Sequence, residues 1–352
     1  MSVTSTHRSP PRDVPGRRQF LNDRDSFVHE ALEGFALAHR DLVSLSSDPD
    51  FLLRAPAGRR PGKVALVAGG GAGHEPLHTG FVGVGMLDAA VPGRVFTSPT
   101  ALQVAAATRA AHTGAGVVHV VKNYTGDVLN FRIAAEIAHD DGVDVEQVLV
   151  ADDLATDPAV TGLDSGPGRR GTTAVLVVEK VCGAAAEAGA PLVDVAALGR
   201  RVAARARSLS LALSAPTHPG ERWPSFDLPP DEVEFGVGIH GERGVDRRPF
   251  APAAELVEQL VGPVAEAVEV SRGDAVLLVV DGLGSTHPLE LSLAYREVVR
   301  VLDRRGVSVA RSYLGSPVTA LDTAGLSVAL VPADDELVRL WDAPVRTPAW
   351  TR

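Results

Sequence analysis

Short apolar runs alternate with longer alanine-rich stretches along most of this chain, and this alternation limits the possible folds more than any other feature. Residues 63–71, 116–127 and 146–153 are rich in valine and lead into glycine or polar residues, as strands that end in loops do. Residues 172–189 and 191–213 have the length and alanine content of helices. Strands and helices in this order predict an α/β fold.

The C-terminal half repeats the pattern. It predicts a helix from residue 253, a strand over 275–284, a helix over 289–306, a strand over 307–315 and a last strand and helix near 327–341. A chain of 352 residues suits two α/β domains. We expect a disordered tail over 1–18, an N-terminal domain over 19–190 that carries the substrate site at its strand ends, and a C-terminal domain over 191–352.

Composition excludes several classes of function. The formal net charge of −10 argues against a nucleic-acid surface, because phosphate binding needs clustered lysine and arginine. The single cysteine, Cys182, rules out an internal disulfide, fits a reducing cytoplasm and has apolar neighbours typical of a buried thiol. No run of residues is long and apolar enough to span a membrane. We therefore expect a cytoplasmic protein with small-molecule or protein partners.

Three consecutive glycines, Gly69 to Gly71, follow an apolar run and precede the sequence AGHEPLH. Glycines at a strand end allow close approach to a ligand. The spacing matches neither a dinucleotide fingerprint, since His74 or Pro76 stands where the last glycine belongs, nor a phosphate-binding loop with Gly-Lys-Ser/Thr. His74 and His78 are four residues apart, but Pro76 lies between them and no third metal ligand is evident, so no metal is expected.

Five segments carry a resemblance to a known family. They are AGGGAGHEPLHTGFVGVGM, VKNYTGDVLNF, ADDLATDPAVTGLDSGPGRRG, VEKVCGAAAEAG and FGVGIHGERGVDRRPF. Together with the C-terminal LGSPVTALDTAGLSVALVPADDELVRLW, they closely resemble the substrate-binding K subunits of dihydroxyacetone kinases. The resemblance runs from about Gln19 to Trp350 and keeps the order of the motifs.

The resemblance implies a catalytic role for three residues. His240, expected from the C-terminal domain, would add a ring nitrogen to the ketone of dihydroxyacetone and hold it as a hemiaminal. His74 would hydrogen-bond the bound ketone, and Asp127 would accept the proton of the hydroxyl that attacks phosphorus. Covalent capture suits a small polar triose, which offers little apolar area for binding. Outside these motifs, a lone His240 would be read as structural and Asp127 as a turn residue.

The resemblance also implies substrate contacts from Gly70, Gly71 and Lys122, although a lysine in the position of Lys122 can equally be a solvated surface residue. Two positions depart from the family pattern. Ala72 stands where serine is frequent, and Arg243 stands where proline is common. Both lie beside the expected site and bear on which sugar is preferred.

Partners follow from the resemblance as well. This chain is expected to bind no cofactor itself and to need an L-type subunit that carries ATP or ADP with Mg²⁺, recharged in some bacteria by a phosphotransferase-system protein. A homodimer is implied. Two alternatives stay open: a kinase subunit for four-carbon ketoses such as erythrulose, and a ketone-sensing transcriptional co-activator of the same family.

Overall fold

The computed structural model describes residues 17–161 and 168–352. The disordered tail expected over 1–18 lies outside the described residues except at its end. There the backbone N–H of Arg17 donates to the Arg222 carbonyl, and just beyond it the Gln19 side chain donates to the carbonyls of Thr217 and His218. The start of the described chain is therefore attached to the C-terminal half.

The N-terminal half forms a six-stranded sheet in the order β1-β2-β4-β3-β5-β6. Its strands are β1 (Val43–Ser46), β2 (Phe51–Arg54), β3 (Ala65–Ala72), β4 (Ala89–Val95), β5 (Val117–Lys122) and β6 (Val145–Val150). Strands β3 to β6 run parallel, whereas β1 and β2 are antiparallel. The parallel order brings the carboxyl ends of β3 and β5 to one edge, where ligands gather in such sheets.

The first helices of this half are α1 (Phe27–Ala38), α2 (Ala101–Ala111) and α3 (Thr125–Asp140). Helices α2 and α3 pack against each other and against one face of the sheet. In α3 the buried residues Phe131, Ala134 and Ala138 recur at helical spacing, which fixes the face that this helix presents to the sheet.

The C-terminal half forms a second six-stranded sheet in the order β11-β10-β12-β7-β8-β9. Its strands are β7 (Arg207–Ala212), β8 (Glu232–Phe235), β9 (Asp246–Pro249), β10 (Ala275–Gly282), β11 (Ser308–Gly315) and β12 (Gly325–Pro332). Only the pair β10 and β11 is parallel. Helices α7 (Ala253–Ala267) and α8 (Pro288–Arg305) cover its outer face.

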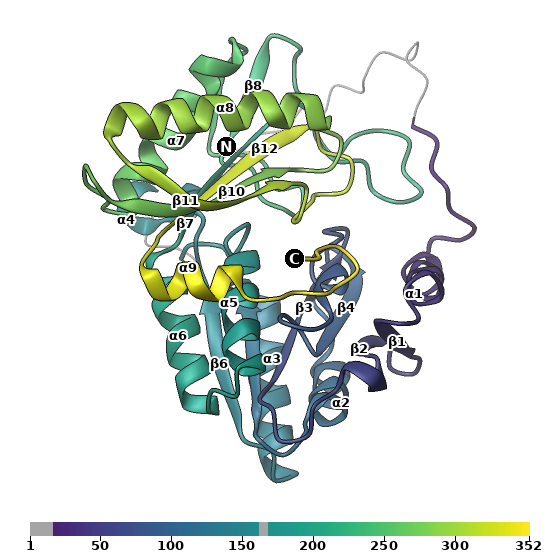
Figure 1. The fold of residues 1–352 in the computed structure, drawn as a ribbon. Coiled ribbons are helices and arrows are strands. Elements are labelled where there is room, and N and C mark those ends of the chain that lie inside the picture. The colour runs from purple at the N-terminus through teal and green to yellow at the C-terminus, as the bar shows by residue number, and fades with distance from the viewer. Residues whose placement is uncertain (1–16, 162–167) are drawn as a thin grey trace.

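A helical layer lies between the two sheets (Figure 1). It contains α5 (Val175–Glu187), α6 (Leu192–Arg205) and α9 (Asp335–Asp342), whereas the short α4 (Pro158–Thr161) lies outside it. Every residue of α5 from 175 to 186 is buried, because α5 packs on β3 and β5 and is flanked by α6 and α9. Short 3-10 turns occur at Pro56–Gly58, Thr79–Phe81 and Leu154–Thr156. The two-sheet α/β architecture confirms the predicted fold class.

The structure corrects two predicted elements. The helix expected over 191–213 ends at Arg205, and Arg207–Ala212 forms β7, which pairs with both β12 and β8. Serine and leucine alternate in this segment with the period of a strand, a signal that the preceding alanine-rich run obscures. The strand expected over 116–127 ends at Lys122, so Asp127 lies in the first turn of α3. The domain boundary near residue 190 falls between α5 and α6 and stays a prediction.

Burial agrees with the reading of Cys182 as a structural thiol. The residue is completely buried in α5, and burial raises the pKa of its thiol to about 12. None of the described helices combines the length and apolar character that a membrane crossing requires.

Candidate active site

His240 follows β8 in a loop of the second sheet, and its side chain is 17% exposed. Its Nδ1 lies 3.3 Å from Oε1 of Glu242, and its backbone N–H donates to Oε2 of the same carboxylate at 2.8 Å. A carboxylate only accepts, so in the neutral ring Nδ1 carries the hydrogen. Nε2 of His240 is therefore the nitrogen with a free lone pair.

A second charged group, Arg170, lies near Glu242. A Cβ atom on Gly238 would lie 2.0 Å from Glu242 Oε2 and 2.6 Å from Arg170 Nη1, so the close approach of these groups requires glycine at this position. Burial acts to raise the pKa of Glu242, but the hydrogen bond from His240 and the charges of His240 and Arg170 outweigh it and lower the pKa to about 2. Glu242 is thus ionised whenever the protein is folded near neutral pH.

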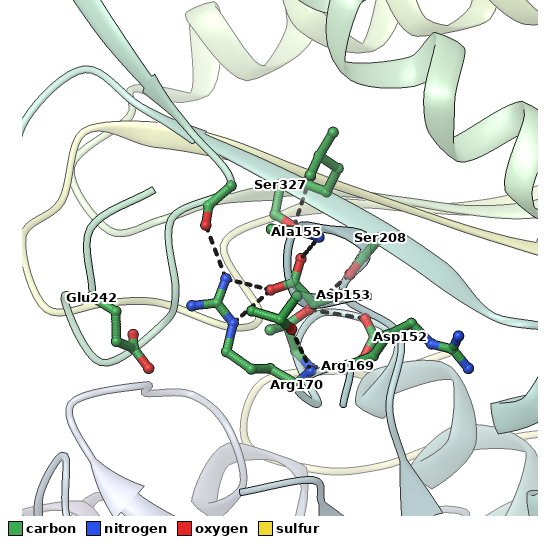
Figure 2. Close-up of polar contacts among 12 residues, drawn as sticks. Asp152, Asp153, Ala155, Arg169, Arg170, Ser208, Glu242 and Ser327 are labelled. Atoms are coloured by element: carbon green, nitrogen blue, oxygen red, sulfur yellow. Dashed lines mark hydrogen bonds and ion pairs between the residues drawn. The ribbon is translucent and has the colours of Figure 1, made fainter. Parts of the chain in front are cut away.

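Arg170 links this loop to the first half of the chain. Its Nε donates to Asp153 Oδ2 at 2.8 Å and its Nη2 to the Gly236 carbonyl at 2.9 Å. Figure 2 shows Glu242 on the side of the guanidinium opposite Asp153. Burial raises the pKa of Asp153 to about 6, even though Arg170 acts in the opposite direction. The loop that carries His240 is therefore tied to the residues after β6.

Aromatic rings surround His240. Its ring centroid lies 4.4 Å from that of Tyr124, 4.7 Å from that of His74 and 5.5 Å from that of Phe96, all in edge-to-face geometry. The rings of Tyr124, His74 and Phe96 come from three different loops or element ends, and together they fix the plane of the His240 imidazole.

His74 lies in the loop after β3 and is completely buried. Its Nδ1 is 2.8 Å from the Thr319 carbonyl, which can only accept, so Nδ1 carries the hydrogen. Burial lowers the pKa of His74 well below its usual value, and the charges of His240 and Lys122 act in the same direction. The ring is neutral, and its Nε2 is a buried acceptor without a hydrogen-bond partner among the described residues.

Lys122 and Asp127 form a buried ion pair, with Nζ 3.4 Å from Oδ2. Lys122 is completely buried, so the alternative of a solvated surface lysine is wrong. Asp127 lies in the first turn of α3, where the helix dipole favours a negative charge. Within the described residues its Oδ1 is buried and has no hydrogen-bond partner. One oxygen of Asp127 is thus held by the lysine, and the other is left for a ligand.

Gly70 and Gly71 lie inside β3 rather than in a loop. A Cβ atom on Gly70 would lie 2.1 Å from Lys122 Nζ, and one on Gly71 would lie 2.7 Å from the Cα of Phe96. The protein itself therefore requires both glycines, because they make room for Lys122 and for the loop that carries Phe96. Their predicted contacts with the substrate stay a prediction.

His74 and His78, the candidate metal pair, have different partners. His74 bonds to Thr319, whereas His78 bonds to Lys122 and Glu179. Across residues 17–161 and 168–352, no group of three or more histidine, cysteine, aspartate or glutamate side chains is arranged to hold a metal ion.

Comparison with known proteins agrees with this geometry. The model of the Dak1 domain matches residues 33–349. The chain belongs to the Dak1 family. A relative from Listeria innocua, the dihydroxyacetone-binding subunit DhaK of PTS-dependent dihydroxyacetone kinase 1, is 42% identical over 334 residues, which covers 95% of this chain and 100% of the relative.

Two solved structures share the fold of this Dak1 chain. The dihydroxyacetone kinase of C. freundii in complex with AMP-PNP and Mg²⁺ superposes with a TM-score of 0.86 at 32% identity, covering 95% of this chain and 61% of that one. The dihydroxyacetone kinase operon co-activator Dha-DhaQ superposes with a TM-score of 0.85 at 30% identity, covering 92% and 98%. Kinase and co-activator therefore share this architecture.

Sequence reasoning missed several residues of the Dak1 site. Glu242 stands two positions after His240, and an acid so close to a candidate nucleophile is a signal that could have identified it. Tyr124 lies inside the motif of Asp127. Arg170 lies inside the segment ADDLATDPAVTGLDSGPGRRG, but its contact with the Gly236 carbonyl, like that of Phe96 with His240, depends on how the two halves pack.

Proposed function

We propose that this chain captures dihydroxyacetone as a hemiaminal on His240 and presents it for phosphoryl transfer from a partner subunit, yielding dihydroxyacetone phosphate. The observation that carries the proposal is the 3.3 Å contact between His240 Nδ1 and Glu242 Oε1, which assigns the hydrogen to Nδ1 and leaves Nε2 as the nucleophile. A relative that is 42% identical over 95% of this chain is named as a dihydroxyacetone-binding subunit, which supports this substrate.

Capture begins when Nε2 of His240 forms a bond to the carbonyl carbon and the π electrons of the carbonyl move to its oxygen. The Nδ1 proton passes to Glu242 and from there through solvent to the former carbonyl oxygen, so Glu242 is ionised again and the adduct is neutral. His74 Nε2, a neutral acceptor, can then receive a hydrogen bond from the new hydroxyl group. The charge of Glu242 stabilises the positive imidazole ring that forms on the way.

Transfer uses the second part of the site. Asp127 accepts the proton of a terminal hydroxyl group while that oxygen forms its bond to phosphorus and the bond to the donor phosphate breaks. Lys122 holds Asp127 Oδ2, so the unpartnered Oδ1 is the basic atom. ATP or ADP with Mg²⁺ would be carried by an L-type partner, with or without a phosphotransferase-system protein. A homodimer stays a prediction.

Intact-protein mass spectrometry tests capture. After incubation with dihydroxyacetone and mild trapping, the wild-type protein should gain the mass of one triose. His240→Ala should gain none, whereas the control His139→Ala, at an exposed position late in α3, should behave as wild type. A His240→Ala protein that is still labelled would refute the hemiaminal. An adduct with erythrulose but not with dihydroxyacetone would show that the substrate is a four-carbon ketose, captured by the same chemistry.

The second candidate function is a ketone-responsive co-activator, which the likeness to Dha-DhaQ favours. A sensor needs capture but no base. An assay with the L-type partner separates the two functions: formation of dihydroxyacetone phosphate that depends on Asp127 supports the kinase subunit, and capture without transfer supports the sensor. The buried pair of Lys122 and Asp127 favours the kinase subunit.

A further inference from the structure

A series of buried polar groups continues from Asp127. It consists of Lys122 at the end of β5, His78 after β3 and Glu179 in the middle of α5, which are 0%, 5% and 0% exposed. Lys122 Nζ lies 3.0 Å from His78 Nε2, and His78 Nδ1 lies 2.5 Å from Glu179 Oε1. Burying polar groups in this way lowers the stability of the fold unless each group is hydrogen-bonded, so this series of buried groups needs an explanation.

The partners fix the direction of each hydrogen bond. Lys122, as an ammonium group, only donates, so His78 Nε2 accepts and Nδ1 carries the ring hydrogen. Nδ1 then donates to Glu179. Burial lowers the pKa of His78 well below its usual value, which keeps the ring neutral. Burial raises the pKa of Glu179, and the charge of Lys122 acts against that rise.

All three N–H groups of Lys122 have partners in the protein. They are the Gly69 carbonyl at 3.0 Å, His78 Nε2 at 3.0 Å and Asp127 Oδ2 at 3.4 Å. The absent side chain of Gly70 provides the space that Nζ occupies. A predicted contact between Lys122 and a substrate hydroxyl group would have to displace one of these three.

We propose that Glu179 is a positioning residue for phosphoryl transfer: it fixes the tautomer of His78, and His78 in turn holds the ammonium group of Lys122 against Asp127. The inference rests on the proposed function and adds a residue to it. Without an acceptor at position 179, the His78 ring is free to place its hydrogen on Nε2, where it would face the ammonium group as a second donor. Lys122 would then leave its place, and Asp127 would lose the contact that directs Oδ1.

Two variants and a matched control test this inference. Glu179→Met removes the acceptor, and Glu179→Gln keeps an oxygen that can accept. The control is Glu187→Gln, the same exchange at the end of the same helix, where the carboxylate pairs with Arg54. Eight residues separate the two sites, which is about 12 Å along a helix. Capture is measured by the mass gain, and kcat and KM for dihydroxyacetone are measured with the L-type partner.

We expect Glu179→Met to lower kcat by at least about tenfold, the scale of one hydrogen bond to a charged group, with capture and KM unchanged. Glu179→Gln should recover part of the loss, and Glu187→Gln should stay within about twofold of wild type. A folded Glu179→Met protein with wild-type kcat would overturn the inference. A loss of capture that parallels the loss of kcat in Glu179→Met and Glu179→Gln would also overturn it. If Glu179→Met does not fold, the test is made with His78→Gln. An unchanged kcat in that variant would show that His78 does not connect Glu179 to Lys122. A wild-type protein that captures no ketone would refute the proposed function itself, and this inference with it.

Discussion

Replacing Glu242 by glutamine should weaken ketone capture while leaving the fold intact. The carboxylate does two things: it accepts from Nδ1 of His240 and so frees Nε2, and its charge stabilises the imidazole ring as the bond to the ketone forms. Glutamine keeps the size but is neutral, and its amide N–H₂ can face Nδ1 and reverse the tautomer. The equilibrium constant for hemiaminal formation should therefore fall.

The pKa of Glu242 gives an upper limit for the effect, because the shift also includes the charge of Arg170, which the variant retains. A pKa of about 2 in place of the ordinary 4.5 corresponds to a favourable interaction of roughly 3 kcal/mol at 1.36 kcal/mol per unit. The Glu242 side chain is 37% exposed, so solvent screening reduces this figure. About 1.5 kcal/mol remains as the expected cost, which is the lower end for a hydrogen bond to a charged group and corresponds to about tenfold weaker capture.

Carbon-13 NMR with dihydroxyacetone labelled at the carbonyl carbon measures this constant directly, because the carbon changes from a trigonal to a tetrahedral signal on capture. The matched control is Glu232→Gln, whose carboxylate has nearly the same exposure, 38%, and pairs with Arg247 instead of a histidine. Wild type and Glu232→Gln should bind alike. If Glu242→Gln captures the ketone as tightly as Glu232→Gln, the carboxylate does not set the reactivity of His240, and the argument fails.

Three further predictions concern the base, an internal acid and the thiol. Asp127→Asn should keep capture but lower phosphoryl transfer by about 10²–10⁴-fold, the range for loss of a general base, and a transfer rate near that of wild type would remove Asp127 from this role. Asp153 has a pKa raised from 3.8 to about 6, so its contribution to stability is present below pH 3.8 and is lost as pH rises through 6. The free energy of unfolding of wild type relative to Asp153→Asn should therefore fall by up to about 3 kcal/mol between about pH 4 and 6. A difference that rises with pH would contradict this sign. Cys182, with a buried thiol of pKa about 12, should resist iodoacetamide in the native protein and react once the chain is unfolded; equal rates in the two states would show that the thiol is accessible.

Local patterns in the sequence predicted the fold class and several of the strands and helices. Residues 63–71 and 146–153 cover strands β3 and β6 except for one residue of each, and the helix expected from residue 253 begins at Ala253 as α7. The errors arose where local signals conflict with tertiary pairing. No glycine or proline separates the segment Arg207–Ala212 from the alanine-rich helix α6, which obscures the strand period of its serines and leucines, and its pairing with β12 and β8 decides the structure.

The site was harder to predict, because its contacts join residues that are far apart in the chain. The structure brings His240 and His74 together and pairs Lys122 with Asp127. The contact that fixes the tautomer of His74 comes from Thr319, 245 positions away. The bond between His78 and Glu179 spans 101 positions. No spacing rule for a single sequence links such residues.

The two halves of the molecule contribute different parts of the proposed chemistry. The loop after β8, in the second sheet, supplies His240 and Glu242 for capture, whereas the end of β5 and the start of α3, in the first sheet, supply Lys122 and Asp127 for transfer. The contacts that join the halves at this point include the bond of His74 to the Thr319 carbonyl and that of Arg170 to the Gly236 carbonyl. Because the capturing group and the base do not share an element, variants at Asp127 should change transfer without changing capture, whereas variants at His240 or Glu242 should change transfer only through the loss of captured ketone. A shift of one sheet relative to the other would instead change the geometry of both steps together.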